Sequence, residues 1–407
     1  MSEAADKKGL LDGIKVLEIA DEKGQYCGKV LASLGAEVIK IEKPGGDPAR
    51  KIGPFYKDRP SPEGSLYWWF HNTSKKSITL DLETSDGQVI FKRLIKEVDI
   101  LLETPSPGVA EGAGLGYEAL AEINKGLILG SITNFGKKGP HADYKAPDIV
   151  GAAMGVLMSI IGEPDKPPLR PYGDAGFFAA SAWASVAVLT ALNARDVTGK
   201  GQLIEIPMQA CIAVSLEYTF PYYAYLGDNL KRMGARLQVM GPGNVSSCYP
   251  CKDGYIFAVP MAPPLDWMEE EGMVDDLKED ERLWYDWPYR ISKEEHISEV
   301  FAPFIKKHTK KEIFDKIIEE RSVWMPVHTF EEVATDPHLR ERGYFTEVEH
   351  PDLDAKIPYP RPPARVRGIP DQMTRAPGIG EHNEEIYLGK LELSREELIS
   401  LASAGIV

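Results

Sequence analysis

The sequence predicts an α/β protein with a doubly wound parallel sheet in its first half. Residues 13–20 form an apolar, strand-like run, residues 27–36 show a helical pattern, and residues 37–50 begin with a second strand. A connection of this length predicts a parallel pair of strands with a right-handed crossover. The alternation continues with strands over 76–82, 99–104 and 126–135, a helix over 86–98 and a strand within 195–208. In such a sheet, functional residues belong at the carboxyl ends of the strands.

One carboxylate, Asp174, stands close before an apolar run, residues 176–194, that carries no charged side chain. The run is long enough to cross a membrane. It is rich in alanine and serine and stands alone in the sequence. We therefore expect a buried core helix and no membrane partner.

Composition divides the chain into three segments. Residues 1–215 hold the α/β alternation and are predicted to form the N-terminal part of a large domain. Residues 225–325 carry charged amphipathic patterns, which are typical of a smaller, separately packed domain. Residues 330–407 begin with a proline-rich stretch, which favours an extended segment that returns to the large domain.

The charge and cysteine content exclude several classes of partner. The net charge is −15 and no Lys/Arg-rich block is present, which disfavours nucleic acid and anionic membranes. Four cysteines are too few for a disulfide scaffold, and no apolar signal segment opens the chain, so a cytoplasmic protein is expected. Cys248 and Cys251 form a CxxC pair, but no second pair stands at zinc spacing, so we expect no metal.

Seven segments, spread over nearly the whole chain, resemble the class III CoA-transferase family and occur in the family's order. This group contains the formyl-CoA, carnitine and bile-acid CoA-transferases and is related to the 2-methylacyl-CoA racemases. The segments are LDGIKVLEIA, LASLGAEVIKIEKPGGDPAR, NTSKKSITLDLETSDG, YGDAG, LNARDVTGKGQ, DPHLRERG and RAPGIGEHNEE.

The resemblance implies a Rossmann-like large domain built from both chain ends, plus a smaller middle domain. It also implies an interlocked dimer, either a homodimer or a heterodimer with a related subunit. A chain that must return across a gap favours extended backbone of low entropy, which agrees with the proline-rich segment after residue 330.

The family's nucleophile is an aspartate before a long helix, and Asp174 is the residue that matches it. A carboxylate suits this chemistry because its attack on a thioester gives a mixed anhydride, which remains reactive enough for CoA to attack in turn. Gly173 and Gly176 leave room for the thioester. The alternative is that Asp174 is only an N-cap, the commoner role of an aspartate before a helix.

The substrates implied are an acyl-CoA, such as succinyl-CoA, and a carboxylic acid, with CoA passing through an aspartyl-CoA thioester. The segment MGPGNV matches the place of a glycine-rich loop that covers the active site in relatives, with Gly241 and Gly243 as hinges. Pro242 departs from the family's glycine run, and the segment is otherwise a loop leading into a hairpin near residues 251–259.

Because the protein is acidic overall, lysine or arginine side chains must be gathered at the CoA site to hold its phosphates. By resemblance, Lys43, Lys75 and Lys145 match phosphate or adenine contacts, and Arg50 is a further candidate. For each cation the alternative is a solvated surface charge.

The CoA segment also departs from the family pattern. Thr104 replaces the usual asparagine, and Gly112 stands where an arginine is expected. The early turn ADEKGQYCG is one residue short and lacks the glutamine found in formyl-CoA transferase, which argues against formyl or oxalyl specificity.

Two other functions are alternatives to CoA transfer. A racemase needs a His-Asp pair upstream of the catalytic aspartate, and here that pair reads Pro147-Asp148, so transfer is favoured. A non-catalytic partner subunit of a heteromeric transferase remains the main alternative. The aromatic clusters at 67–70, 218–225 and 284–289 are core or interface packing by default; if one lines the acyl pocket, a benzylsuccinate-type acid ranks first.

Overall fold

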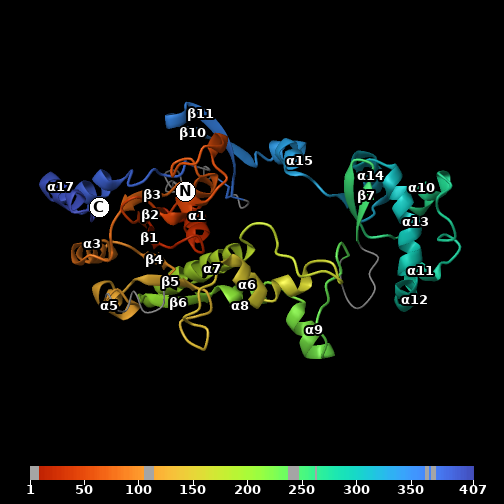
Figure 1. Cartoon of the computed structure of the whole chain (residues 1–407), viewed down its shortest axis with the longest axis horizontal. Helices are drawn as coiled ribbons and strands as arrows, with labels where there is room; N and C mark the ends of the chain where they lie inside the picture. Colours follow the sequence, from red (N-terminus) through yellow and green to blue (C-terminus); the bar gives the residue numbers. More distant parts are fainter. Residues whose placement is uncertain (1–8, 105–113, 237–246, 262–263, 363–365, 368–372) are drawn as a thin grey trace. The chain divides into compact units, whose positions relative to one another are not determined.

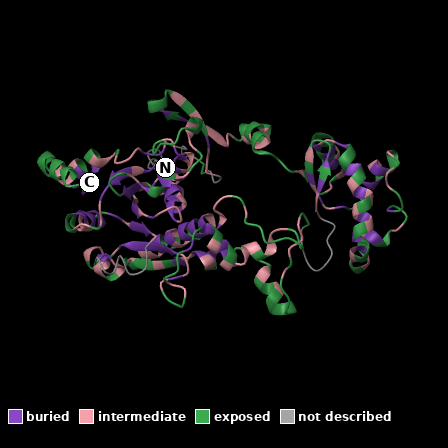
Figure 2. Ribbon diagram, viewed as in Figure 1, coloured by how far each residue is buried: buried purple, intermediate pink, exposed green. Residues whose placement is uncertain are grey.

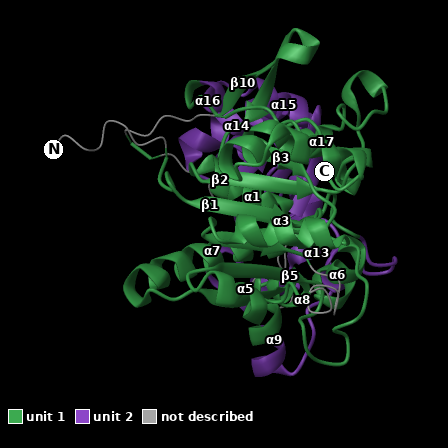
Figure 3. Ribbon diagram, turned by 90° about the vertical axis from the view of Figure 1, so that its left-hand side faces the viewer, with its two compact units in different colours: residues 1–157, 170–221, 341–407 green, residues 158–169, 222–340 purple. Residues whose placement is uncertain are grey.

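The computed structural model describes the chain except residues 1–8, 105–113, 237–246, 262–263, 363–365 and 368–372. It contains two compact units, coloured separately in Figure 3. Unit 1 comprises residues 1–157, 170–221 and 341–407, and unit 2 comprises residues 158–169 and 222–340.

These units differ from the three predicted segments in two places. Residues 158–169 join unit 2, where the amide of Gly234 donates to the carbonyl oxygen of Gly162 over 3.0 Å. Residues 330–340 also belong to unit 2 rather than to the return segment. Both differences arise from long-range contacts, which composition does not report.

Unit 1 contains a six-stranded sheet in which every pair is parallel, with the order β3-β2-β1-β4-β5-β6 (Figure 1). This is a doubly wound order, in which the direction of winding reverses between β1 and β4. The parallel α/β sheet predicted from the sequence is therefore confirmed. The strands are β1 (Lys15–Ile19), β2 (Glu37–Glu42), β3 (Lys76–Thr79), β4 (Ile100–Glu103), β5 (Ile128–Thr133) and β6 (Gln202–Pro207).

Both faces of this sheet are covered, so strands β1 to β5 are largely buried, whereas the edge strand β6 is mostly exposed (Figure 2). Neighbouring residues of β1 divide between the faces, with Val16 in one core and Leu17 in the other. The core of Val16 is completed by α1 (Gln25–Ser33), α7 (Ala175–Thr198) and α8 (Met208–Val214). The core of Leu17 is completed by α3 (Ser85–Ile95), α5 (Tyr117–Ile123) and the C-terminal segment.

Both ends of the chain contribute to unit 1. The amide of Asp81 donates to the carbonyl oxygen of Ile406 over 2.8 Å, and the Tyr387 hydroxyl donates to that of Thr79 over 2.5 Å. Ile386 and Tyr387 are fully buried against the sheet. The last helical elements are a π-helix (Glu385–Lys390) and α17 (Arg395–Ser403).

The proline-rich return segment is partly a hairpin, where an extended connection was expected. Strands β10 (Phe345–His350) and β11 (Ala355–Pro360) pair antiparallel. Val348 and Tyr359 point from this hairpin into a small core with Trp68 and Trp69 of α2 (Leu66–His71). Burial of these two apolar side chains stabilises the hairpin.

Helix α7 is long and apolar enough to cross a membrane by length and composition, but half of its most apolar window is buried within the protein. It packs along the sheet, with Ala180, Ala184 and Val188 fully buried. Gly199 ends the helix in the left-handed conformation, with φ of 71°. The expectation of a core helix agrees with this packing.

Unit 2 has its own core beneath an antiparallel sheet of β7 (Ser247–Cys251), β8 (Gly254–Ala258) and β9 (Trp324–Pro326). Phe301, Phe304 and Trp324 are fully buried in it. Its helices include α10 (Leu265–Glu270), α11 (Arg282–Tyr285), α12 (Trp287–Ser292), α13 (Glu294–Lys307), α14 (Lys310–Glu320), α15 (Phe330–Thr335) and most of α16 (Pro337–Glu341). Helix α9 (Thr219–Leu226) contains the boundary between the units.

A buried ion pair fixes helix α1 against the sheet. Glu18 of β1 and Lys75 have fully buried side chains, and Lys75 Nζ lies 2.9 Å from Glu18 Oε2. A Cβ atom at Gly28 of α1 would lie 1.7 Å from the same oxygen. Glycine at this position therefore allows the helix to approach the buried pair.

We expect Gly28→Ala to destabilise the protein by several kcal/mol, because the added methyl group displaces a buried, paired carboxylate. Thermal or urea unfolding checks this. The matched control is Gly389→Ala, where an added Cβ meets nothing within 4 Å. Equal stability of the two variants would contradict the packing described.

Another buried lysine, Lys29 of α1, forms no ion pair with a carboxylate in the part of the chain that the structure describes. Its ammonium lies 3.5 Å from the centroid of the Phe70 ring, and burial, together with Lys75, lowers the pKa of Lys29 to about 7. In the unfolded chain a lysine keeps its proton up to about pH 10.4. Between these values the unfolded state binds more protons, so this residue makes stability rise with pH.

We expect Lys29→Met to stabilise the protein at pH 6.5 and to have a smaller effect at pH 9.5, because the burial of a charged amine is removed. Unfolding midpoints across this pH range measure the effect. Lys96→Met, at an exposed position, is the control. A stability difference that does not vary with pH would contradict this account of Lys29.

Candidate active site

The loops after β1 and β4 meet at the point where the winding of the sheet reverses. The amide of Asp21 donates to Thr104 Oγ1 over 2.7 Å, which joins the two loops. Ser181 of α7 donates its hydroxyl to the carbonyl oxygen of Lys23 over 2.7 Å. The N-terminal part of α7 is thereby tied to the switch point of the sheet, where doubly wound folds place their ligands.

Asp174 occupies the N-cap position of α7, with φ of −106° and ψ of 63°. Gly173 before it has a φ of 78°, which favours glycine and turns the chain into the helix. The Asp174 side chain is half-buried and makes no capping hydrogen bond to the helix. The reading of Asp174 as a side-chain cap is therefore not what this structure shows.

The capping role belongs instead to Asp148, the first residue of α6 (Asp148–Met154). Its Oδ1 accepts hydrogen bonds from the amides of Gly176, at 2.7 Å, and Phe177, at 3.1 Å. A Cβ atom at Gly176 would lie 2.9 Å from Asp148 Oδ1, so glycine allows this close approach. Two amides of the first turn of α7 are thus satisfied without Asp174.

Tyr67 of α2 is the aromatic residue on which Asp174 acts electrostatically. Its hydroxyl is buried and has no hydrogen-bond partner of normal geometry. Burial comes first among the causes that raise the pKa of Tyr67, followed by the negative charge of Asp174, a hydrogen bond to the Asp174 side chain and, more weakly, the charge of Glu22. Tyr67 therefore keeps its proton and is available as a hydrogen-bond donor beside Asp174.

An aromatic cluster lies around the start of α7. The rings of Tyr26 and Phe178 are 4.6 Å apart, and Phe70 and His71 of α2 complete the group. Burial lowers the pKa of His71 to about 4, so its imidazole is neutral at physiological pH. This cluster places apolar surface next to the helix turn that carries Asp174.

Two of the lysines predicted to hold CoA are exposed. Lys43 follows β2 and forms an ion pair with Glu83, with 2.5 Å between Nζ and Oε1. Both side chains are largely exposed, so the pair is weak and can be exchanged for a phosphate. Lys145 is also exposed and forms no ion pair with any residue that the structure describes.

The other predicted cations, Lys75 and Arg50, are buried. The Lys75 ammonium is held by Glu18, and Arg50 donates to both carboxylate oxygens of Glu42, at 2.6 and 2.7 Å. The exposed fractions of these two cations are 0% and 1%. Their placement argues against direct contact with a phosphate, and they hold the strands and loops together instead. Thr104, which was also predicted to contact CoA, accepts a hydrogen bond from the Asp21 amide and so joins the two loops.

The predicted glycine hinges, Gly241 and Gly243, lie outside the described residues, as does Gly112 at the expected arginine position. Within the described ranges, no group of three or more His, Cys, Asp or Glu side chains is placed to hold a metal ion. Cys248 and Cys251 are free thiols on β7.

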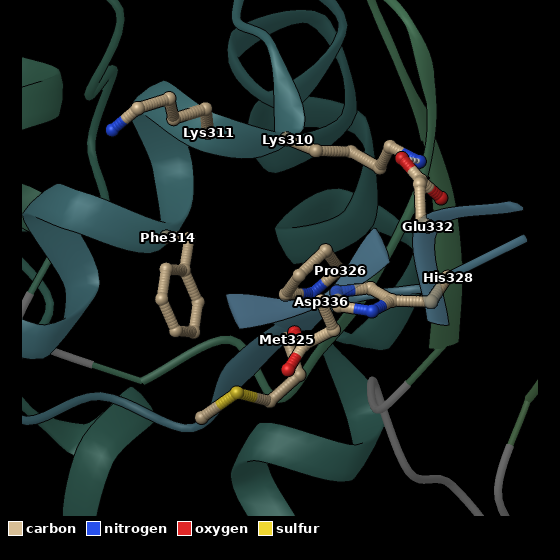
Figure 4. A pocket seen from close by; sticks show the side chains of 8 residues that line it. All are labelled: Lys310, Lys311, Phe314, Met325, Pro326, His328, Glu332 and Asp336. Atoms are coloured by element: carbon tan, nitrogen blue, oxygen red, sulfur yellow. Dashed lines mark hydrogen bonds and ion pairs between the residues drawn. The ribbon is translucent and has the colours of Figure 1, made fainter. Parts of the chain in front are cut away.

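Unit 2 contains a hollow of about 450 Å³ that does not include Asp174 (Figure 4). Lys310 of α14 pairs with Glu332 of α15 at its edge, and both charges are therefore engaged. Its lining consists of Lys310, Lys311, Phe314, Met325, Pro326, His328, Glu332 and Asp336. The aspartate belongs to the DPHLRERG segment, whose residues 336–340 lie in unit 2.

The sequence did not reveal Asp148 and Tyr67 as parts of the site. In the sequence, Asp148 stands out only as half of the Pro-Asp pair at the position of the racemase dipeptide, and Tyr67 only as part of an aromatic cluster. An available signal was the Pro147-Asp148 pair, since proline before an acidic residue is typical of a helix start. No local signal indicates that this carboxylate serves a helix that begins 27 residues later.

Comparison with known proteins adds relatives of known activity. Succinyl-CoA:(R)-benzylsuccinate CoA-transferase subunit BbsE of Thauera aromatica is 31% identical over 385 residues, which cover 92% of each chain. Succinyl-CoA–D-citramalate CoA-transferase of Chloroflexus aurantiacus is 33% identical over 402 residues, which cover 98% of each chain.

A solved structure and a family model agree with these relatives. A CaiB/BaiF family protein from Brucella suis superimposes with a TM-score of 0.82 at 28% identity, covering 96% of this chain and all of the other. The model of CoA-transferase family III matches residues 11–383. The resemblance inferred from the seven segments is thereby confirmed, and the chain belongs to CoA-transferase family III.

Proposed function

We propose that this chain transfers CoA from an acyl-CoA donor to a carboxylic acid, with Asp174 as the nucleophile. The observation that carries the proposal is the state of the Asp174 side chain: it stands at the start of α7 without a capping hydrogen bond. A half-buried, uncapped carboxylate, at the start of a helix that Ser181 ties to the loop after β1, suits attack on a thioester.

The cycle consists of four attacks. The Asp174 carboxylate attacks the thioester carbonyl, the C–S bond breaks, and CoA leaves as a thiolate. The thiolate attacks the Asp174 carbonyl of the mixed anhydride, which releases the donor acid and leaves an aspartyl-CoA thioester. The acceptor carboxylate attacks this thioester and again expels the thiolate, which then attacks the acceptor carbonyl. Acyl-CoA is released and the Asp174 carboxylate is regenerated.

Each attack creates a negative oxygen that needs a hydrogen-bond donor. The amides of Gly176 and Phe177 are already occupied by Asp148, so they do not supply it. The buried Tyr67 hydroxyl interacts with the Asp174 carboxylate, through its charge and as a hydrogen-bond donor. Tyr67 therefore supports the proposal as a donor to the developing oxyanion.

The phosphates of CoA are proposed to bind the exposed cations Lys43 and Lys145. Both offer an ammonium to solvent, unlike the buried Lys75 and Arg50. For the acid, relatives that use succinyl-CoA support a donor of this kind, and the aromatic cluster beside α7 supports an acceptor with an apolar or aromatic body. A benzylsuccinate-type acid fits this description.

A second chain is proposed to complete the assembly, as an interlocked homodimer or a heterodimer. Apolar side chains of α7 and α8 remain exposed in the isolated chain, among them Trp183 at 43% and Val186 and Val214 at 58% each. Exposed apolar surface of this kind marks an interface. One relative is named as a subunit, so the chain is alternatively the supporting, non-catalytic member of a pair.

We expect incubation with succinyl-CoA followed by hydroxylamine to convert Asp174 to a hydroxamate, because hydroxylamine attacks both the anhydride and the aspartyl thioester. Peptide mass spectrometry locates the modification. Asp174→Asn should abolish it, whereas Asp196→Asn, at an exposed position of the same helix, should leave it intact. Modification of a partner's aspartate, with Asp174 untouched, would instead make this chain the supporting subunit.

We expect Lys43→Ala and Lys145→Ala each to raise the KM for acyl-CoA roughly two- to fivefold with little change in kcat, since an exposed charge contributes up to about 1 kcal/mol. The effect should shrink at high ionic strength, because salt screens exposed charges. Lys96→Ala is the control. An unchanged KM in both variants at low salt would remove these lysines from the CoA site.

A further inference from the structure

At the start of α7, the carboxylates of Asp174 and Asp148 are both candidates to accept hydrogen bonds from the amides of the first turn. An aspartate at the N-cap position gains stability by turning its carboxylate onto the amides of the first turn. Such a carboxylate is held by two donors and is a poorer nucleophile, since hydrogen bonds stabilise its charge. In this chain the N-cap residue, Asp174, makes no such bond.

Asp148 accepts the hydrogen bonds from the α7 amides that Asp174 does not cap. It comes from another helix, is 3% exposed, and accepts from Gly176 and Phe177 through one oxygen only. The other oxygen, Oδ2, is buried and has no hydrogen-bond partner. Burial, with a smaller contribution from the charge of Asp174, raises the pKa of Asp148. The two amide hydrogen bonds offset part of the cost of burying this carboxylate, while Oδ2 stays unpartnered.

Glycines around Asp148 allow the helices to pack closely enough for this capping contact. An added Cβ at Gly176 would lie 2.8 Å from Ile212 and 2.9 Å from Asp148, and one at Gly151 would lie 2.5 Å from Met208. Glycines on α6 and α7 therefore bring the two helices and α8 close enough for Asp148 to reach the amides. The hydrogen bonds from the α7 amides to Asp148 therefore depend on the close packing of α6, α7 and α8.

We propose that Asp148 is a positioning residue that caps α7 in place of Asp174 and so keeps the Asp174 carboxylate free for acylation. The inference rests on the proposed function, since it assigns a role to Asp148 only through the nucleophile. In Asp148→Ala the two amides lose their acceptor, and Asp174 is expected to turn onto them. The same change removes a buried charge close to the nucleophile.

The test compares acylation of Asp174 in the full-length protein, with succinyl-CoA as acyl donor and hydroxylamine trapping as readout. We expect Asp148→Ala to slow acylation about 5- to 30-fold, the factor by which a typical capping free energy shifts an equilibrium, with KM unchanged. Asp148→Asn keeps an oxygen acceptor of the same shape and should restore most of the rate. A crystal structure of Asp148→Ala should show the Asp174 carboxylate within hydrogen-bond distance of the Gly176 or Phe177 amide.

A matched control separates capping from stability. Ser394 caps α17 of the same unit through its hydroxyl, so Ser394→Ala removes a cap of the same class far along the chain from the nucleophile. It should lower stability without slowing acylation. Normal acylation in Asp148→Ala, or an Asp174 side chain that stays away from the amides, would overturn the role of Asp148. Absence of acylation at Asp174 in the unaltered protein would instead overturn the proposed function, and the role of Asp148 with it.

Discussion

The hydrogen bonds from the first turn of α7 to Asp148 are the contact on which the site depends. A helix start has amides that must find acceptors, and the residue at the N-cap position normally provides one. Here the acceptor is brought by α6, and Asp174 keeps the N-cap position without the N-cap bond. Asp174, the proposed nucleophile, thus holds the N-cap position while Asp148 makes the capping hydrogen bonds.

The rest of unit 1 holds this contact in place. The loops after β1 and β4 are joined through Asp21 and Thr104, and Ser181 ties α7 to them. Glu18 and Lys75, fully buried, fix α1 against the sheet on the same side as α7. These contacts limit how far the helix start can move, which is what the proposed attack of Asp174 on a thioester requires.

The alternation of strands and helices was sufficient to predict the parallel sheet and the core helix, because buried parallel strands appear as short apolar runs. Asp174 was predicted as the nucleophile from its glycine context and the family resemblance, and this role stays a prediction; the structure shows only that its side chain makes no capping hydrogen bond. The buried positions of Lys75 and Arg50 were not predicted, since their carboxylate partners are distant in sequence. For the same reason, neither Asp148 nor the hydrogen-bonded hairpin of β10 and β11 was predicted. Local patterns report periodicity and motifs, whereas ion pairs and caps between elements depend on the tertiary fold.

The most direct test of Asp174 as the covalent carrier is to trace oxygen-18 from the acceptor acid to the Asp174 side chain. The protein is supplied with succinyl-CoA and with succinate that carries oxygen-18 in both carboxylates. When the acceptor attacks the aspartyl thioester, its oxygen becomes the bridge of the anhydride and stays on Asp174 after CoA attacks the acyl carbonyl. The account predicts oxygen-18 in the peptide that contains Asp174. Labelled succinyl-CoA formed while this peptide stays unlabelled would contradict it.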